Sequence, residues 1–250
     1  MILLIDAGNT RIKWRALDAA GEIAVAEGAF GHDRLHEFGA LLRQLPGLER
    51  VLGANVAGDA VAATVTAALA ERAGGHGLRP QWLLPTERCC GVRNLYAQPA
   101  QLGADRWAAL IGARAQHRHA ALVVTAGTAT TIDVLDGAGN FQGGLILPGV
   151  DLMRRALALN TARLPFADGH YADTPRTTAD AIHSGSLQAQ AGAVERMFRQ
   201  LAGDAHALCL LGGGAADGFA PLLDLPLRRV DNLVLDGLAR IAAEDPGLPR

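Results

Sequence analysis

The N-terminal residues carry the hydrophobic pattern of two short strands joined by a polar, glycine-containing turn. The continuous apolar run at residues 2–5 predicts a buried strand, and the alternating apolar residues at 12–16 predict a second strand. The middle of the chain repeats this pattern, with an apolar run at 121–124 and a strand-like segment at 131–135. The sequence therefore predicts two β-hairpins about half a chain apart.

The two predicted hairpins also resemble each other in detail. Aligning Gly8 with Gly127 pairs the alanines that precede them, and a slip of one residue then aligns residues 17–21 with residues 135–139. Such a match arises either by chance between two ordinary hairpins or from an internal duplication that makes two similar domains. On the second interpretation we expect one domain at 1–115 and another at 116–250.

The segments around the hairpins alternate between strand and helix patterns. Residues 51–54 and 81–84 favour strands, and residues 60–73 between them favour a helix, an alternation typical of α/β proteins. Further expected elements, in chain order, are a helix starting near Ala104, a loop over 164–176, a helix capped by Thr177 or Thr178, a buried strand over 208–211, and a helix capped by Asp231 or Asn232.

Composition limits the class of protein. The chain has 250 residues, of which half are hydrophobic and 19% are charged, as expected for one or two globular domains with an aliphatic core. The formal charge of −2 and the lack of a basic patch argue against a nucleic-acid partner. Apolar stretches are too short for a transmembrane helix. Cys89 and Cys90 are neighbours, poorly placed to bridge each other, so we expect a reducing, cytoplasmic location.

The turn of the first hairpin has side chains suited to a phosphate group. Asp6 could hold a metal ion or its water, Gly8 lets the backbone approach closely, Asn9 and Thr10 offer donors, and Lys13 adds a positive charge. The alternative interpretation is an ordinary hairpin turn, because aspartate, glycine and asparagine are common turn residues.

Two further glycine turns favour a nucleotide-binding protein. Gly127–Thr128 repeats the first turn, and residues 212–214 form a third glycine turn, so a nucleotide gripped between two domains is the hypothesis these turns support. The motifs of P-loop and dinucleotide-binding folds do not occur in the sequence. Zinc-site and α/β-hydrolase motifs do not occur in it either.

Asp105 and Arg106 are candidates for chemistry at the start of the helix near Ala104. The functional hypothesis is a carboxylate general base beside a cation that recognises an anionic substrate. The alternative is an acidic residue favoured by the helix dipole, with a solvated arginine next to it. Tyr96 lies on the approach to this helix and is either a site residue or a partly buried connector residue.

Five motifs in order along the chain resemble those of the type III pantothenate kinase family. They are residues 6–13 (DAGNTRIK), Tyr96 followed by 102–106 (LGADR), 127–133 (GTATTID), 143–149 (GGLILPG) and 178–185 (TADAIHSG). The resemblance implies an α/β fold of two duplicated actin-like, ribonuclease H-like domains with a nucleotide cleft between them.

The resemblance also implies an activity. It is the ATP- and Mg²⁺-dependent phosphorylation of pantothenate to 4'-phosphopantothenate, the first step of coenzyme A biosynthesis, by a homodimer. On this pattern Asp105 is the general base, and Asp6 holds Mg²⁺ through water or phosphate. The implied ATP-binding residues are Asp6, Ala7, Gly8, Asn9, Thr10, Arg11, Ile12, Lys13 and Thr128, and the implied pantothenate-binding residues are Tyr96, Gly103, Ala104, Asp105, Arg106 and Thr178.

Two positions depart from the family pattern. Thr125 stands where many members have an aspartate that helps to bind a monovalent cation, so the K⁺ or NH₄⁺ site is in doubt. Thr177 stands where asparagine is common, next to the matched Thr178. Two alternative functions stay open: a nucleotide-binding regulatory accessory protein on the same fold, and a kinase of another small hydroxyl compound.

Overall fold

The computed structural model describes residues 1–72, 78–161, 164 and 166–244. The chain forms two compact units. The first unit comprises residues 1–116 together with the C-terminal segment that begins at Asn232, and the second comprises residues 117–231. Among the described residues, no helix is long and apolar enough to cross a membrane.

The first unit is built on a five-stranded sheet with the order β3-β2-β1-β4-β5. β1 is antiparallel to β2 and parallel to β4, and β4 is parallel to β5. The strands are β1 (Ile2–Ala7), β2 (Arg11–Leu17), β3 (Ala24–Gly31), β4 (Arg50–Asn55) and β5 (Pro80–Trp82). The other elements of this unit are η1 (His32–Glu37), α1 (Phe38–Arg43), α2 (Asp59–Arg72), β6 (Arg88–Cys89), β7 (Val92–Asn94), η2 (Pro99–Gln101), α3 (Ala104–Gln116) and α6 (Leu233–Glu244).

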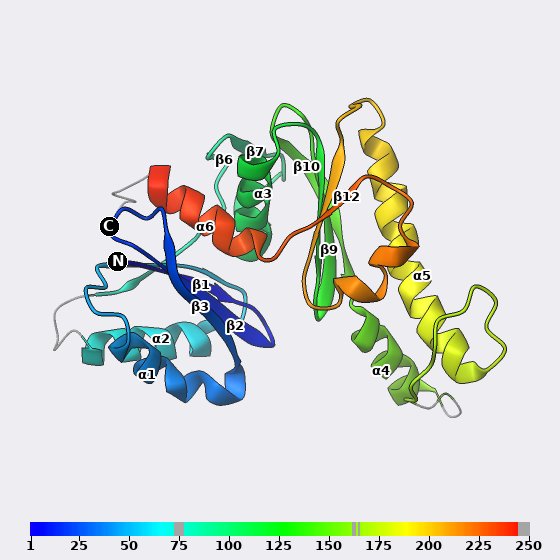
Figure 1. Ribbon diagram of the computed structural model, residues 1–250, viewed down its shortest axis with the longest axis horizontal. Coiled ribbons are helices and arrows are strands. Elements are labelled where there is room, and N and C mark those ends of the chain that lie inside the picture. The colour runs from blue at the N-terminus through cyan, green and yellow to red at the C-terminus, as the bar shows by residue number, and fades with distance from the viewer. Residues whose placement is uncertain (73–77, 162–163, 165, 245–250) are drawn as a thin grey trace. The chain divides into compact units, whose positions relative to one another are not determined.

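Side-chain alternation along β1 decides which way Asp6 faces. Leu3, Ile5 and Ala7 belong to the core formed with α1 and α2, whereas α6 packs on β1 and β4 from the other side of the sheet (Figure 1). Because successive side chains of a strand point to opposite faces, Leu4 and Asp6 face the side that α6 covers. The strand therefore places the Asp6 carboxylate on the face of the sheet that α6 covers.

The second unit repeats this sheet. Its strands have the order β10-β9-β8-β11-β12, with β8 antiparallel to β9 and parallel to β11, and β11 parallel to β12. The strands are β8 (Ala121–Ala126), β9 (Ala129–Leu135), β10 (Asn140–Pro148), β11 (Leu208–Gly212) and β12 (Leu227–Arg229). The other elements are α4 (Val150–Asn160), α5 (Thr178–Phe198), η3 (Arg199–Leu201), η4 (Ala216–Gly218) and η5 (Ala220–Leu222). Matching order and direction confirm the predicted duplication.

The turns after the two hairpins repeat as well. Gly21 donates its N–H to the carbonyl of Asp18, and Gly139 donates to the carbonyl of Asp136, at 3.1 and 2.9 Å. Both glycines have positive φ, and both aspartates accept backbone N–H groups on Oδ1. The one-residue slip in the sequence alignment therefore joins two equivalent Asx turns.

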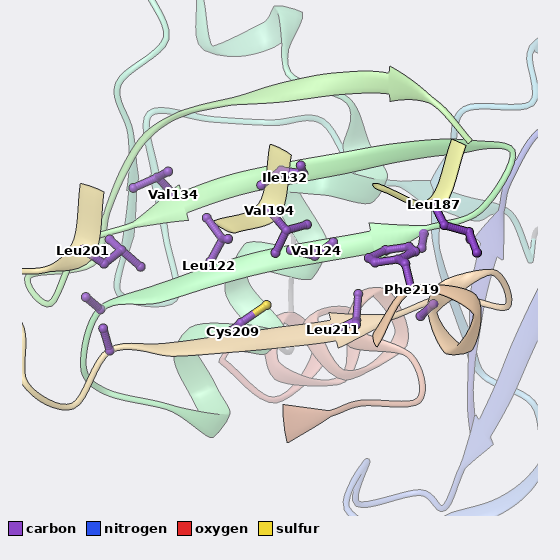
Figure 2. Packing of buried hydrophobic residues seen from close by; sticks show 14 of the residues in the cluster. Leu122, Val124, Ile132, Val134, Leu187, Val194, Leu201, Cys209, Leu211 and Phe219 are labelled. Carbon is purple, nitrogen blue, oxygen red and sulfur yellow. The ribbon is translucent and has the colours of Figure 1, made fainter. Parts of the chain in front are cut away.

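The core of the second unit lies between its sheet and α5 (Figure 2). Leu122 and Val124 of β8 point toward Leu187 and Val194 of α5, and Phe219 closes one end of the cluster. Cys209, which is fully buried on β11, serves as a small hydrophobic residue in this cluster.

Most expected elements form, with shifted ends. The strand expected at 81–84 is β5, which ends at Trp82, and the helix expected at 60–73 is α2, which ends at Arg72, while residue 73 lies outside the described residues. The hydrophobic pattern did not predict α4 or the third strands β3 and β10. β3 lies at the edge of its sheet and buries only Phe30, so its sequence lacks the apolar alternation that identifies a half-buried strand.

The last helix belongs to the first unit, whereas the sequence-based division at 115/116 grouped it with the second domain. α6 packs closely against α3 through two glycines. A Cβ on Gly237 would collide with the carbonyl of Ala108, and a Cβ on Gly112 would collide with the carbonyl of Leu233. These close backbone contacts between α3 and α6 hold the C-terminal segment in the first unit.

Replacing Gly237 with alanine should destabilise the protein by about 1–3 kcal/mol, because the added methyl group forces the α3 and α6 backbones apart. The control is Gly39→Ala in α1 of the same unit, where the added Cβ meets only the Arg43 guanidinium at 3.9 Å. Denaturant unfolding compares the two variants. An equal effect of both substitutions would contradict the role of Gly237 in helix packing.

Candidate active site

The first hairpin turn presents its backbone and two polar side chains at the end of β1. Gly8 donates its N–H to the carbonyl of Arg11 at 3.1 Å, which closes the turn, and Asn9 and Thr10 at its tip are exposed. A Cβ on Gly8 would lie only 3.3 Å from the same carbonyl oxygen. The His32 ring is 2.8 Å from the carbonyl of Gly8 and fixes the base of the turn. This arrangement suits a bound anion.

Asp6 is buried and incompletely neutralised. Lys13 lies directly opposite it on β2, with Nζ 4.0 Å from Oδ2, and the Asn232 side chain donates to Oδ2 at 3.3 Å. Burial raises the pKa of Asp6 from 3.8 to about 6, while Lys13 and Asn232 act in the opposite direction and the charge of Asp105 raises it further. A buried carboxylate with such a pKa is the kind of group that a divalent cation would complement.

Asn232 contacts Asp6, although its local sequence pattern indicates only a candidate helix cap. Its Oδ1 accepts the N–H of Leu235 at 3.0 Å, so it does cap α6, and its Nδ2 donates to Asp6. One amide therefore ties the start of α6 to the carboxylate at the end of β1. The helix cap can be predicted from the residues next to Asn232. The contact with Asp6 cannot, because the two residues are 226 positions apart in the sequence.

Replacing Asn232 with aspartate should raise the pKa of Asp6 by about one unit or more, because a second carboxylate replaces the donor at 3.3 Å. The Asn232→Ser variant keeps a capping oxygen and loses the donor, so it should raise the pKa by less. The measurement is the pH titration of the Asp6 carboxyl carbon by NMR. An unchanged pKa in both variants would contradict the contact.

Asp105 lies in the first turn of α3, with its carboxylate folded back over the helix start. The N–H of Arg106 donates to its Oδ1 at 2.8 Å, and the carbonyl of Gly103 accepts the N–H of Trp107 at 3.0 Å. A Cβ on Gly103 would lie 2.6 Å from Oδ1 of Asp105, so glycine leaves the space that the carboxylate uses. Ala104, between them, is buried. Asp105 itself is half-buried.

Tyr96 and Arg106 form a second polar group beside Asp105. Arg106 donates from Nη1 to the Tyr96 hydroxyl at 3.2 Å, and its guanidinium carbon lies 5.8 Å from the centre of the Tyr96 ring. Arg106 is only 6% exposed, so the interpretation as a solvated arginine is wrong. Asn94 accepts the N–H of Tyr96 and thereby orients the segment that carries the tyrosine.

The second unit has a comparable phosphate-type turn. Thr128 lies exposed at the tip of the β8–β9 hairpin, and its carbonyl accepts the N–H of Gly149, which precedes α4, at 2.9 Å. Gly213, with positive φ, packs against the carbonyl of Ala126 at the end of β8. The hairpin tip, the start of α4 and the third glycine turn therefore lie at one end of this sheet. Positive dipole ends of helices favour bound phosphate.

Three further threonines singled out in the sequence also lie in the second unit. Thr178 is the first residue of α5 and lines a groove of about 790 Å³ with Leu157 of α4 and Ile182 of α5. Thr177 caps α5, because its hydroxyl accepts the N–H of Asp180 at 3.1 Å. Thr125 is half-buried on β8, opposite Thr131 of β9 and Gly212 of β11.

The predicted site residues thus fall into two groups. Residues 6–13, Tyr96 and residues 103–106 belong to the first unit, in which the charge of Asp105 acts on Asp6. Thr125, Thr128 and Thr178 belong to the second unit.

Comparison with known proteins identifies the family. The model of the type III pantothenate kinase family matches residues 2–200. The type III pantothenate kinase of Aromatoleum aromaticum is 61% identical over 245 residues, which cover 98% of this chain and 99% of that protein. The one from Azoarcus sp. BH72 is 56% identical, with 98% and 92% covered. The chain belongs to the type III pantothenate kinase family.

Solved structures confirm the fold of this type III pantothenate kinase family member. The activator of 2-hydroxyisocaproyl-CoA dehydratase from Clostridium difficile, solved with bound ADPNP, matches with a TM-score of 0.54 over 97% of this chain and 93% of that one, at 12% identity. The ethanolamine utilization protein EutJ from Carboxydothermus hydrogenoformans matches with a TM-score of 0.52 over 96% and 88%, at 16% identity. The predicted α/β fold of two duplicated actin-like domains is confirmed.

Proposed function

We propose that this enzyme transfers the γ-phosphoryl group of ATP to the primary hydroxyl of pantothenate, giving 4'-phosphopantothenate and ADP. The observation that carries the proposal is the Asp105 carboxylate at the start of α3, beside the Tyr96–Arg106 pair, in a chain of this family. A protein that only binds a nucleotide needs no carboxylate base next to a pair of groups suited to an anionic substrate.

Asp105 would accept the proton of the attacking hydroxyl. Phosphoryl transfer depends mainly on positioning and charge neutralisation, so a fixed carboxylate that orients the nucleophile supplies what the reaction needs. The hydrogen bond from the Arg106 N–H holds one oxygen of Asp105 and leaves the other for the substrate. Arg106 donates from Nη1 to the Tyr96 hydroxyl, and the positive charge of its guanidinium would pair with the carboxylate of pantothenate.

Asp6, with Lys13 and the Gly8–Thr10 turn, would hold the phosphates of ATP and Mg²⁺. Mg²⁺ neutralises the charge of the phosphates, and it usually keeps several waters while binding one or two carboxylates. The carboxylate of Asp6 fits this ligand set, because burial raises its pKa and the opposing effects of Lys13 and Asn232 do not fully offset that rise. Thr128, beside the start of α4, would contact ATP from the second unit.

The decisive experiment is an ADP-release assay with pantothenate, with a panel of sugars and other small hydroxyl compounds, and without any acceptor. Pantothenate-dependent ADP release is the expected result. ADP release with another acceptor alone would favour a kinase of a different substrate. ATP binding without ADP release under any of these conditions would favour a regulatory nucleotide-binding protein.

Because Thr125 replaces the aspartate that many family members have at this position, we expect a weaker dependence of activity on a monovalent cation. A hydroxyl in place of a carboxylate leaves only neutral oxygen ligands for K⁺ or NH₄⁺, so affinity should fall and Thr125→Asp should restore it. The measurement is activity against KCl, NH₄Cl and a bulky organic cation at fixed ionic strength, with Thr125→Ser as control. Saturation of the unmodified enzyme by K⁺ on the order of a few millimolar, with no gain from Thr125→Asp, would refute the expectation.

We also propose that the enzyme is a homodimer and acts in the cytoplasm. Helix α4 exposes Leu152, Leu157 and Leu159, of which Leu157 lines the groove together with Thr178, and exposed apolar side chains favour a protein contact. Sedimentation analysis of the native chain tests the oligomeric state. The cysteines are unbridged thiols, which a reducing compartment maintains.

A further inference from the structure

The β6–β7 hairpin holds two thiols side by side at its turn. Cys89 ends β6 and pairs with Val92 of β7, so that Cys90 and Gly91 form a two-residue turn. The two sulfur atoms lie 3.4 Å apart, and both cysteines are half-buried and therefore reachable from solvent.

The backbone of this turn explains why the two sulfurs converge. Cys90 and Gly91 both have positive φ, of 49° and 78°, the combination that a type I′ hairpin turn requires. Adjacent side chains on a continuing strand would point to opposite faces, whereas the left-handed conformation turns Cys90 toward Cys89. Among the described residues, Cys90 is the one non-glycine residue with positive φ, a conformation that costs free energy and that asparagine or glycine adopts more readily.

The backbone geometry of the turn disfavours a disulfide bond between Cys89 and Cys90. The peptide bond between the two residues is trans, which holds their Cα atoms about 3.8 Å apart, below the roughly 4.4–6.8 Å span of ordinary disulfides. The hydrogen bond with Cys89, burial and the Glu244 carboxylate together raise the pKa of the Cys90 thiol, so it stays protonated. The pair is therefore kept as a dithiol.

The separation of the two free thiols is closer to the spacing around a bent centre than to the spacing around a linear one. For two bonds of about 2.3 Å, the sulfurs lie about 4.6 Å apart on a linear centre, about 3.8 Å on a tetrahedral one and about 3.3 Å on a right-angled one. The observed 3.4 Å is closest to the right-angled arrangement, which is that of pyramidal trivalent arsenic. Within the described segments, no three His, Cys, Asp or Glu side chains are placed to hold a metal ion.

We propose that Cys89 and Cys90 form a dithiol binding site for trivalent arsenicals. An organic arsenoxide, R–As=O, reacts with both thiols to form two As–S bonds, and its oxygen leaves with the two thiol protons as one water molecule. Arsenic stays trivalent, so no oxidant or reductant takes part. Its third bond remains with the organic group, so two protein sulfurs complete the site.

The test uses phenylarsine oxide and the full-length protein, with binding followed by intact mass and by titration of accessible thiols. The unmodified protein should take up one arsenical and lose two titratable thiols, and a dithiol competitor should release the adduct whereas a monothiol should not. Cys89→Ser and Cys90→Ser should each bind roughly 10²–10⁴-fold more weakly, because they lose the second, tethered bond. Cys209→Ala removes a buried thiol in the second unit and should bind as the unmodified protein does.

Release of the adduct from the unmodified protein by a monothiol would overturn the proposal, as would equal affinity in either serine variant. The competitor experiment requires no substitution, so it tests binding by both thiols even if a variant fails to fold. Because every readout is binding, the result is independent of whether the protein phosphorylates pantothenate.

Discussion

Replacing Asp105 with asparagine should lower turnover by roughly 10²–10⁴-fold, the contribution that a positioned general base makes. The amide oxygen of asparagine can still accept the N–H of Arg106 at the start of α3, so the fold and ATP binding should be unchanged. Steady-state kinetics with pantothenate, together with a nucleotide-binding titration, measure both effects. The loss should appear in kcat, because the missing proton transfer belongs to the transition state.

A matched control separates catalysis from helix stabilisation. Asp59 lies in the first turn of α2, as Asp105 does in α3, and is exposed. Asp59→Asn removes the same favourable charge from a helix N-terminus, worth typically 0.3–1 kcal/mol, and should leave turnover unchanged. Near-normal turnover of Asp105→Asn, or an equal loss in both variants, would exclude Asp105 as the base.

Replacing Asp6 with asparagine should raise the Mg²⁺ concentration needed for activity and lower the rate at fixed Mg²⁺. Asparagine is nearly isosteric with aspartate and can keep the neutral contact with Asn232, but it has no charge to offer a cation. The measurement is a Mg²⁺ titration of activity at saturating ATP. An unchanged Mg²⁺ dependence would show that Asp6 is only a turn residue.

The same substitution should stabilise the protein without ligands. The pKa of Asp6 is about 6 in the folded state and 3.8 in the reference state, so the folded protein binds more protons between those values. The unfolding free energy therefore falls as pH rises through roughly 4 to 6, and above pH 6 ionised Asp6 leaves the protein less stable by up to about 3 kcal/mol. Asp6→Asn removes that cost at pH 7 and should gain little at pH 4. Unfolding curves at both pH values measure the difference.

Opposite effects of one substitution on stability and activity identify a functional group. If the carboxylate stabilised the fold, its neutralisation would lower both the stability and the activity of the protein. A carboxylate that destabilises the fold by its burial and serves to bind a cation behaves differently. Its neutralisation should raise the stability of the protein and lower its activity. Equal or lower stability of Asp6→Asn at pH 7 would contradict the second description.

Local patterns in the sequence predicted the features that depend on neighbouring residues. Apolar runs and alternation predicted both hairpins, and the aligned glycines predicted the duplication, because strand periodicity and turn conformation are set within a few residues. For the same reason the sequence predicted caps at Thr177 or Thr178 and at Asp231 or Asn232, and the structure has them at Thr177 and Asn232. The ordered motifs also identified the family, which the comparisons confirm.

Only the tertiary structure decided which distant residues meet. Asn232 reaches Asp6, Arg106 is buried against Tyr96, and α6 returns to the first unit through glycine contacts with α3. The conformation of Cys90, which aligns the two sulfurs, likewise appears only in the folded turn. Each of these depends on how closely two backbones pack or on how a buried charge is surrounded. The sequence by itself therefore determined the elements, the duplication and the chemical side chains available, whereas packing between elements determined which of those side chains share one electrostatic environment.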